Sequence, residues 1–273
     1  MSQLSFRARR LGRRADRSDW VDRAASFGLL AYGLVHVVVG WLAVQLALGD
    51  GAGSASPTGA IEELAQGPMG GAVVWATAVG MYLLVVWQLI EAAVGHRTER
   101  KRTRRRLASA GKAVVFGVLG TSALGIALGS KQQDNEQATD SLTARLMDLP
   151  AGQAIVAAVG AVIIGIGVHL VRNGLTDRFL DTFDGRGTSG TTGTAYTWLG
   201  RAGHVAKGLA LAVVGVLFGW AALTHEPDKS GGLDQALREV LDQPFGPALL
   251  TGIALGICCY GCFCFAWARH LDR

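Results

Sequence analysis

Four cysteines near the C-terminal end form the densest group of potentially reactive side chains. They are Cys258, Cys259, Cys262 and Cys264, all within one apolar stretch. Thiolates at such spacing suggest a metal site, but structural zinc needs four ligands that converge in a tetrahedron. Four positions along one continuous helix cannot converge, so we expect no metal here and favour cysteine as a small packing residue. Thiol redox chemistry and S-acylation of Cys264 are the alternatives.

His36 lies in the middle of the first long apolar segment, where it could bind haem, relay protons or bond a neighbouring helix. Haem b needs two histidines at similar depth. His169 and His204 lie near the ends of their apolar segments, so neither is level with His36. We therefore expect His36 to pack or to make an interhelix hydrogen bond, and we expect no cofactor.

Glu91 is the one acidic residue within a predicted membrane span, and it lies three residues after Gln88 on the same helical face. Ionisable groups inside a membrane are functional candidates by default. Glu91 also lies within a turn of the span end, near His96 and Arg97. This position favours a structural ion pair with one of these two, or with Lys112 or Lys207. The candidate functional polar residues in the spans are thus His36, Gln88 and Glu91.

No catalytic constellation accompanies these residues. The apolar segments contain no Ser/His/Asp set, and the loops between them are short. The glycine-rich stretch at 185–193 lacks the strand, the helix and the Gly-Lys-Ser/Thr sequence of a phosphate-binding loop. The sequence therefore predicts a non-enzymatic protein.

Composition places the candidate residues in a membrane protein. Half of the 273 residues are hydrophobic and only 17% are charged, against about 25% charged residues in soluble domains. Six segments reach the length of about 20 apolar residues that crosses a bilayer. Helix is the form such segments must take, because lipid offers backbone groups no hydrogen-bond partner. The predicted spans are 24–48, 70–94, 109–129, 151–171, 202–223 and 246–268.

Basic residues gather on one side of the predicted membrane. This side holds 22 of the 26 Lys and Arg residues. It comprises the two tails, the loops after the second and fourth spans, and the adjoining span ends. The positive-inside rule places this side in the cytoplasm, so a multi-pass plasma-membrane protein with both termini cytoplasmic is predicted. A run of basic residues lies between the second and third spans. We expect this run to contact anionic lipid headgroups rather than nucleic acid. Its members are Arg100, Lys101, Arg102, Arg104, Arg105 and Arg106.

The chain repeats one unit three times. Each unit is a span, a short amphipathic stretch, a Pro-x-Gly sequence and a return span with basic residues at its end. A proline suits the first turn of a helix, where its missing N–H costs nothing, so each Pro-x-Gly is expected to start a return span. The prolines of these sequences, Pro68, Pro150 and Pro244, are 82 and 94 residues apart. The glycines that open the first span of each unit, Gly28, Gly111 and Gly203, are 83 and 92 residues apart. The two sets of intervals match, which supports the repeat.

Two spans per unit mean that all repeats point the same way. We predict an all-α fold, with six transmembrane helices forming three parallel helical hairpins in a pseudo-threefold bundle. The short stretches between paired spans are expected to lie on the outer membrane surface as amphipathic helices. The predicted division is a basic tail at 1–19, repeats at 20–98, 107–180 and 198–273, and a flexible linker at 181–197.

The chain resembles a bacterial membrane family called domain of unknown function 1206, common in actinobacteria and built of three two-helix repeats. The resemblance covers residues 20 to 273. It rests on Gly203-His204-Val205-Ala206-Lys207-Gly208, Pro244-Phe245-Gly246, Gly256-Ile257-Cys258-Cys259-Tyr260-Gly261 and Glu91-Ala92. The second repeat departs from the pattern, with Asn173 where Glu91 aligns. The resemblance implies the fold and no activity.

Three classes of function fit these observations. The favoured one is a membrane protein that organises lipid or partner proteins, with membrane lipids, a protein partner or a second copy of the chain as its partners. The second is a pore or transporter along the pseudo-threefold axis, lined by small or polar residues such as Gly33, His36, Gln88, Thr121 and Ser122. The third is haem- or thiol-based redox chemistry.

Overall fold

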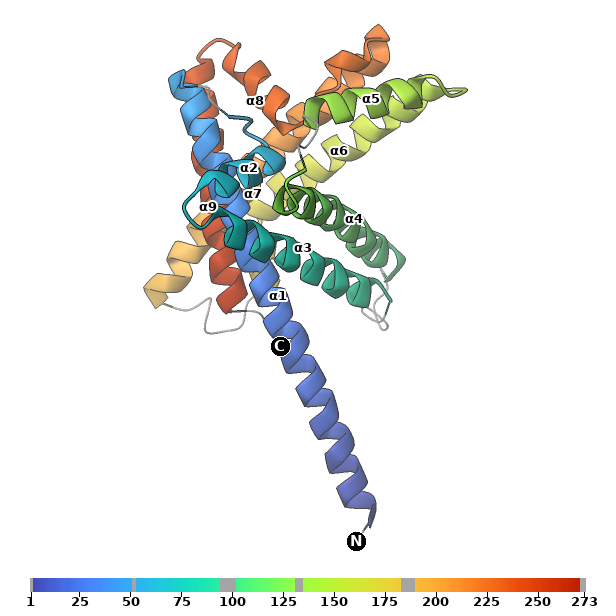
Figure 1. The fold of residues 1–273 in the computed structure, drawn as a ribbon, viewed down its shortest axis with the longest axis vertical. Coiled ribbons are helices and arrows are strands. Elements are labelled where there is room, and N and C mark those ends of the chain that lie inside the picture. Colours follow the sequence, from blue (N-terminus) through green and yellow to red (C-terminus); the bar gives the residue numbers. More distant parts are fainter. Residues whose placement is uncertain (1, 51–52, 94–101, 131–134, 183–189, 271–273) are drawn as a thin grey trace.

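The computed structural model describes residues 2–50, 53–93, 102–130, 135–182 and 190–270, and these form helices joined by short turns (Figure 1). The α-helices are α1 (Ser2–Leu48), α2 (Pro57–Gln66), α3 (Gly70–Ala93), α4 (Arg102–Ala127), α5 (Asn135–Met147), α6 (Gly152–Leu175), α7 (Gly190–Thr224), α8 (Leu233–Leu241) and α9 (Gly246–Arg269). Two short 3₁₀ helices follow α6 and α7: η1 (Arg178–Thr182) and η2 (Pro227–Lys229).

Six helices within the described ranges are long and apolar enough to cross a membrane, which confirms the predicted spans. They comprise most of α1 and α4 and the whole of α3, α6, α7 and α9. The helix α1 continues far beyond the bundle at its N-terminal end (Figure 1). Because apolar runs of this length must satisfy their backbone groups internally, the helical form of the six spans follows directly from composition.

The six long helices form a ring in chain order. The closest pairs are α1 with α9, α3 with α4, and α6 with α7, and each pair joins two different repeats. Figure 1 shows these three pairs as arms that diverge from a common centre. Looser contacts within a repeat join α1 to α3 and α7 to α9, whereas α4 and α6 make no extended contact. The ring is therefore open in the middle repeat.

Equivalent glycines make equivalent contacts within the first and third repeats. A Cβ atom on Gly80 would lie 2.7 Å from the Cβ of Ala31, and one on Gly256 would overlap Ala206. Gly80 and Gly256 each follow their Pro-x-Gly proline by 12 residues. Small residues at these positions let the two helices of a repeat approach closely, so the internal repeat extends to single atomic contacts.

The contacts between repeats follow the same rule. A Cβ on Gly261 would lie 2.6 Å from the carbonyl oxygen of Gly33, where α9 meets α1. The equivalent pair, Gly167 and Gly208, joins α6 to α7, and a Cβ on either would lie 2.6 Å from the other's carbonyl oxygen. At the third interface, Phe116 of α4 occupies the position of Gly33, so that interface packs through a larger side chain.

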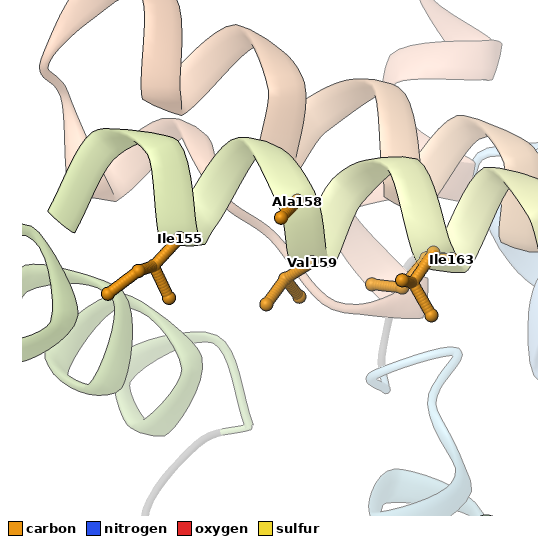
Figure 2. A pocket seen from close by; sticks show the side chains of 5 residues that line it. Ile155, Ala158, Val159 and Ile163 are labelled. Atoms are coloured by element: carbon orange, nitrogen blue, oxygen red, sulfur yellow. The ribbon is translucent and has the colours of Figure 1, made fainter. Parts of the chain in front are cut away.

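The middle repeat lacks the small residues that close the other two. Val114 and Val162 stand at the positions of Ala31 and Gly80, and they are 66% and 62% exposed. A groove of about 370 Å³ runs along this face of α6, lined by Ile155, Ala158, Val159, Val162 and Ile163. Figure 2 shows Ile155, Val159 and Ile163 projecting from one face of the helix. We call this groove the α6 slot.

Each Pro-x-Gly sequence forms the turn that starts a return span. The helices α3, α6 and α9 begin at or next to its glycine, and the proline lies in the preceding turn rather than inside the helix. A Cβ on Gly70, Gly152 or Gly246 would overlap a carbonyl oxygen near the end of the preceding short helix. Glycine is thus required because the two helix ends approach within contact distance.

The short helices pack on the bundle more deeply than predicted. Ile61 of α2 and Leu237 of α8 are fully buried in the main hydrophobic core, so these helices do not simply lie on a membrane surface. The side chain of Asp234 in α8 accepts a hydrogen bond of 2.5 Å from the Ala55 amide, just before α2. Together α2, α5 and α8 define the capped side of the bundle, and we call the opposite side the basic side.

The predicted linker at 181–197 is shorter in the structure. Helix α7 begins at Gly190, so residues 190–197 are helical, while residues 183–189 lie outside the described part of the chain. Threonine hydroxyls accompany this helical start, because Thr194 and Thr197 donate to the carbonyls of Gly190 and Gly193. These local bonds satisfy the hydroxyls within the helix and do not add to its stability.

Candidate functional site

A polar cluster lies inside the bundle where α1, α7 and α9 meet. The ammonium of Lys207 donates hydrogen bonds to the Tyr32 hydroxyl, at 2.6 Å, and to Nε2 of His36, at 3.0 Å. The same ammonium lies 4.1 Å from the ring centroid of Tyr260 and 4.8 Å from that of Tyr32. We call Lys207, His36, Tyr32 and Tyr260 the Lys207 site.

The hydrogen bonds of His36 define its tautomer. Its Nδ1 lies 2.9 Å from the carbonyl oxygen of Tyr32, which can only accept, so Nδ1 carries the proton. Its Nε2 therefore presents a lone pair, and Lys207 donates to it. A neutral imidazole satisfies both contacts at once. The expected interhelix hydrogen bond of His36 is thus present, and its partner is a cation.

Aromatic rings enclose the cluster. His36 and Tyr260 are each 8% exposed, and Phe116 of α4 packs edge-on against the Tyr32 ring at 5.1 Å between centroids. The Tyr260 ring lies between two histidines, 5.0 Å from His36 and 5.3 Å from His204. Ring faces attract a cation electrostatically, which partly compensates the ammonium for lost water.

Helical spacing and one glycine bring these side chains together. Tyr32 and His36 are four residues apart on α1, so they share a face. Gly203 lies one turn before Lys207 on α7, and a Cβ there would lie 2.6 Å from the Cα of Tyr260. The missing side chain lets α9 approach α7 and places the Tyr260 ring against the Lys207 ammonium.

The turn after α6 covers the cluster towards the basic side. Phe179 of η1 is buried, stacks on His204 with 4.9 Å between centroids, and fits against Gly200. Asp177, just before η1, binds the Arg201 guanidinium through two hydrogen bonds of 2.7 and 2.5 Å. This guanidinium holds the pKa of the Asp177 carboxyl below its usual range. An ion pair therefore anchors the Phe179 turn to α7.

The other two polar candidates lie outside the Lys207 site. Gln88 is buried within α3, whereas Glu91, one turn further on, is only half-buried. Glu91 lies within electrostatic range of Lys112 on α4, and its ion pair stays a prediction. Two of its expected partners, His96 and Arg97, lie outside the described residues. His36 is thus the one predicted polar residue that the structure places in the cluster.

The cysteine thiols point in different directions. Cys258 donates to the Val37 carbonyl oxygen at 3.6 Å, Cys264 is fully buried, and Cys262 is exposed. Among the described residues, no three His, Cys, Asp or Glu side chains are grouped as metal ligands. Cys258 and Cys264 fill space between α9 and its neighbours, whereas Cys262 faces outward.

The basic run falls partly outside what the structure describes. Arg100 and Lys101 lie outside the described residues, and Arg102 and Arg104 are described only as part of the α4 backbone. The Arg105 side chain is exposed, and Arg106 donates to the Ala93 carbonyl oxygen at 2.7 Å. Contact of this run with anionic lipid stays a prediction.

The residues expected to line a central axis are not brought together. Gly33 packs against Gly261 of α9, and Thr121 is exposed and bonds back to the Gly117 and Val118 carbonyls of its own helix. Only His36 among them faces the Lys207 site. Polarity alone therefore did not identify which side chains face inward.

Sequence reasoning placed Lys207 near a span end and omitted Tyr32 and Tyr260 from the site. The repeat itself held the missing signal. Tyr32 follows Gly28 by four residues and Lys207 follows Gly203 by four, so they occupy equivalent positions of two repeats. Equivalent positions around a common axis point towards one another, which predicts their contact.

Comparison with known proteins supports the repeat architecture. The model of the Domain of Unknown Function (DUF1206) family matches residues 27–95, 107–177 and 202–270. An uncharacterized protein, YxxB, of Bacillus subtilis (strain 168) is 28% identical over 247 residues, which cover 89% of each chain. No solved structure matches. Neither relationship indicates an enzymatic activity. With three matched copies across most of its length, the chain belongs to the Domain of Unknown Function (DUF1206) family.

Proposed function

We propose that this protein transports a small charged solute across the membrane and binds it at the Lys207 site. One observation carries the proposal: Lys207 lies within a span and contacts His36 from another repeat. Ionisable groups at such depth mark solute or proton pathways in membrane proteins. Transporters built of repeats commonly bind their solute where two repeats meet, and Lys207 and His36 come from the third and first repeats.

A purely structural role does not require this lysine. Placing an ammonium in an apolar interior costs several kcal/mol, and well-packed apolar residues of similar volume are often as stable or more so. Methionine would fill a similar volume without a charge. We therefore assign the charge to ligand binding.

The distribution of basic residues among the loops supports an orientation with the basic side in the cytoplasm.

Flux from proteoliposomes tests the proposal. Separate batches of vesicles are loaded with chloride, acetate, phosphate, sodium or potassium. The efflux of each solute from the vesicles is then measured over time. We expect the wild-type protein to accelerate at least one solute over protein-free vesicles. Lys207→Met and His36→Ala should lower that rate by about tenfold, equivalent to roughly 1.4 kcal/mol.

The matched control is Lys229→Met, which removes an exposed lysine of η2 and should leave the flux unchanged. Failure of the wild-type protein to accelerate any solute would overturn the proposal. Equal flux from wild type and Lys207→Met would also overturn it, because the site would then take no part.

A second function, the organisation of lipid, is favoured by the α6 slot. Helix α6 combines the highest mean hydropathy of the six spans, 2.5, with the lowest buried share, 17%. Aliphatic side chains line the slot throughout. A lipid acyl chain matches such a lining, and it would fill the space that the other repeats close with glycine.

Native mass spectrometry tests lipid retention at the slot. Val162→Trp should fill the groove and reduce the number of co-purified phospholipids per protein. Val168→Trp places the same side chain at another exposed position of α6 and should leave that number unchanged. Equal retention by the two variants would rule out the slot as a lipid site.

A further inference from the structure

The Lys207 ammonium has binding capacity beyond its protein contacts. An ammonium carries three donors, and within the described part of the chain two of them have acceptor atoms, the Tyr32 hydroxyl and His36 Nε2. The remaining side of the group faces the rings of Tyr32 and Tyr260. Ring faces stabilise a cation but leave its third N–H without an acceptor atom, so a ligand that displaces one of the rings can accept from it.

The groups around Lys207 add no negative charge. From α1 come His36 and Tyr32, from α9 Tyr260 and Cys264, from α7 His204, and from α4 Lys112. Among the residues that the structure describes, no carboxylate forms an ion pair with Lys207. Lys112 adds a second positive charge, with Glu91 as its electrostatic neighbour. One uncompensated positive charge therefore lies inside the bundle.

A second donor lies beside the ammonium. The Tyr32 hydroxyl accepts from Lys207, so its own proton is free to be donated. The Tyr260 hydroxyl is within hydrogen-bonding range of Tyr32. When Tyr260 donates to the Tyr32 oxygen, the Tyr32 proton remains available for a ligand. A cation flanked by hydroxyl donors is the arrangement that recognises an anion.

We infer that the Lys207 site binds a small monovalent anion, which accepts from the Lys207 ammonium and the Tyr32 hydroxyl. This inference rests on the proposed transport function and names its substrate class. One negative charge balances the one uncompensated positive charge, and desolvation strengthens their attraction. His36, which accepts from Lys207 in the free protein, releases the ammonium to the arriving anion.

Calorimetric titration of the full-length protein in detergent tests the inference. The protein is purified in sulfate buffer and titrated separately with sodium chloride, sodium nitrate and sodium acetate. We expect saturable binding of at least one of these anions to wild type, lost in Lys207→Met and weakened about tenfold in Tyr32→Phe. Lys207→Arg, which keeps the charge, and Lys229→Met, which changes an exposed lysine, should retain binding.

Absence of saturable binding to wild type, or equal binding to wild type and Tyr32→Phe, would overturn the inference. The Tyr32→Phe comparison holds even where Lys207→Met fails to fold. The transport function and its substrate class fail separately. Flux of sodium or potassium without anion binding would contradict the anion as substrate but agree with a transport function. Anion binding without any flux would agree with an anion site but contradict the transport function.

Discussion

Replacing Gly261 by leucine is expected to destabilise the folded bundle strongly. A Cβ atom at this position would lie 2.6 Å from the Gly33 carbonyl oxygen and 2.9 Å from the Val37 amide nitrogen, and both are backbone atoms that cannot rotate away. The leucine would force α1 and α9, one of the three closest helix pairs, apart along their crossing. Overpacking at such a contact costs about 3 kcal/mol. Titration with SDS should unfold this variant at a clearly lower concentration than wild type.

Gly252→Leu provides the control on the same helix. No heavy atom lies within 4 Å of a Cβ built on Gly252, and the residue is exposed. The same side chain should therefore leave the SDS midpoint close to that of wild type. Equal midpoints for Gly261→Leu and Gly252→Leu would show that the α1–α9 contact does not limit stability.

Replacing Asp234 by alanine is expected to loosen the capped side. Asp234 is 4% exposed, accepts from the fully buried Ala55 amide, and accepts from Arg238 at 2.7 Å. Its loss leaves a buried amide without a partner, which costs about 1–3 kcal/mol. The temperature of thermal unfolding, followed by tryptophan fluorescence, should fall by several degrees.

Two further variants separate this bond from charge alone. Asp234→Asn keeps an oxygen that can accept from Ala55, so it should recover part of the stability. Asp228→Ala removes an exposed acidic residue of η2 and should leave the unfolding temperature nearly unchanged. A fall for Asp228→Ala as large as that for Asp234→Ala would point to net charge as the cause.

The spans and the repeat were predictable because both depend on local composition. A bilayer-length apolar run has one backbone solution, and the spacing of Pro68, Pro150 and Pro244 recurs whatever the helices touch. The turn at each Pro-x-Gly could also be located from the sequence. The sequence did not show that its glycine is needed for close contact with the preceding short helix.

The candidate site was less predictable because it depends on how helices cross. Lys207 lies near a span end in the sequence, yet its side chain reaches His36 in the middle of the first span. Residue position along one helix does not give its depth relative to another helix that crosses it at an angle. The short helices show the same limit, since amphipathic spacing in α8 did not reveal that Leu237 packs into the core.

The open middle repeat has a consequence for assembly during synthesis. The helix α4 can dock on α3, which precedes it, but α6 finds its main partner only in α7, which follows it in the chain. Because α4 and α6 lack the Gly–Ala contact of the other repeats, the middle pair does not fold as a hairpin of its own. The growing chain therefore holds α6 without its main partner until α7 is inserted, so the bundle closes only with its third repeat.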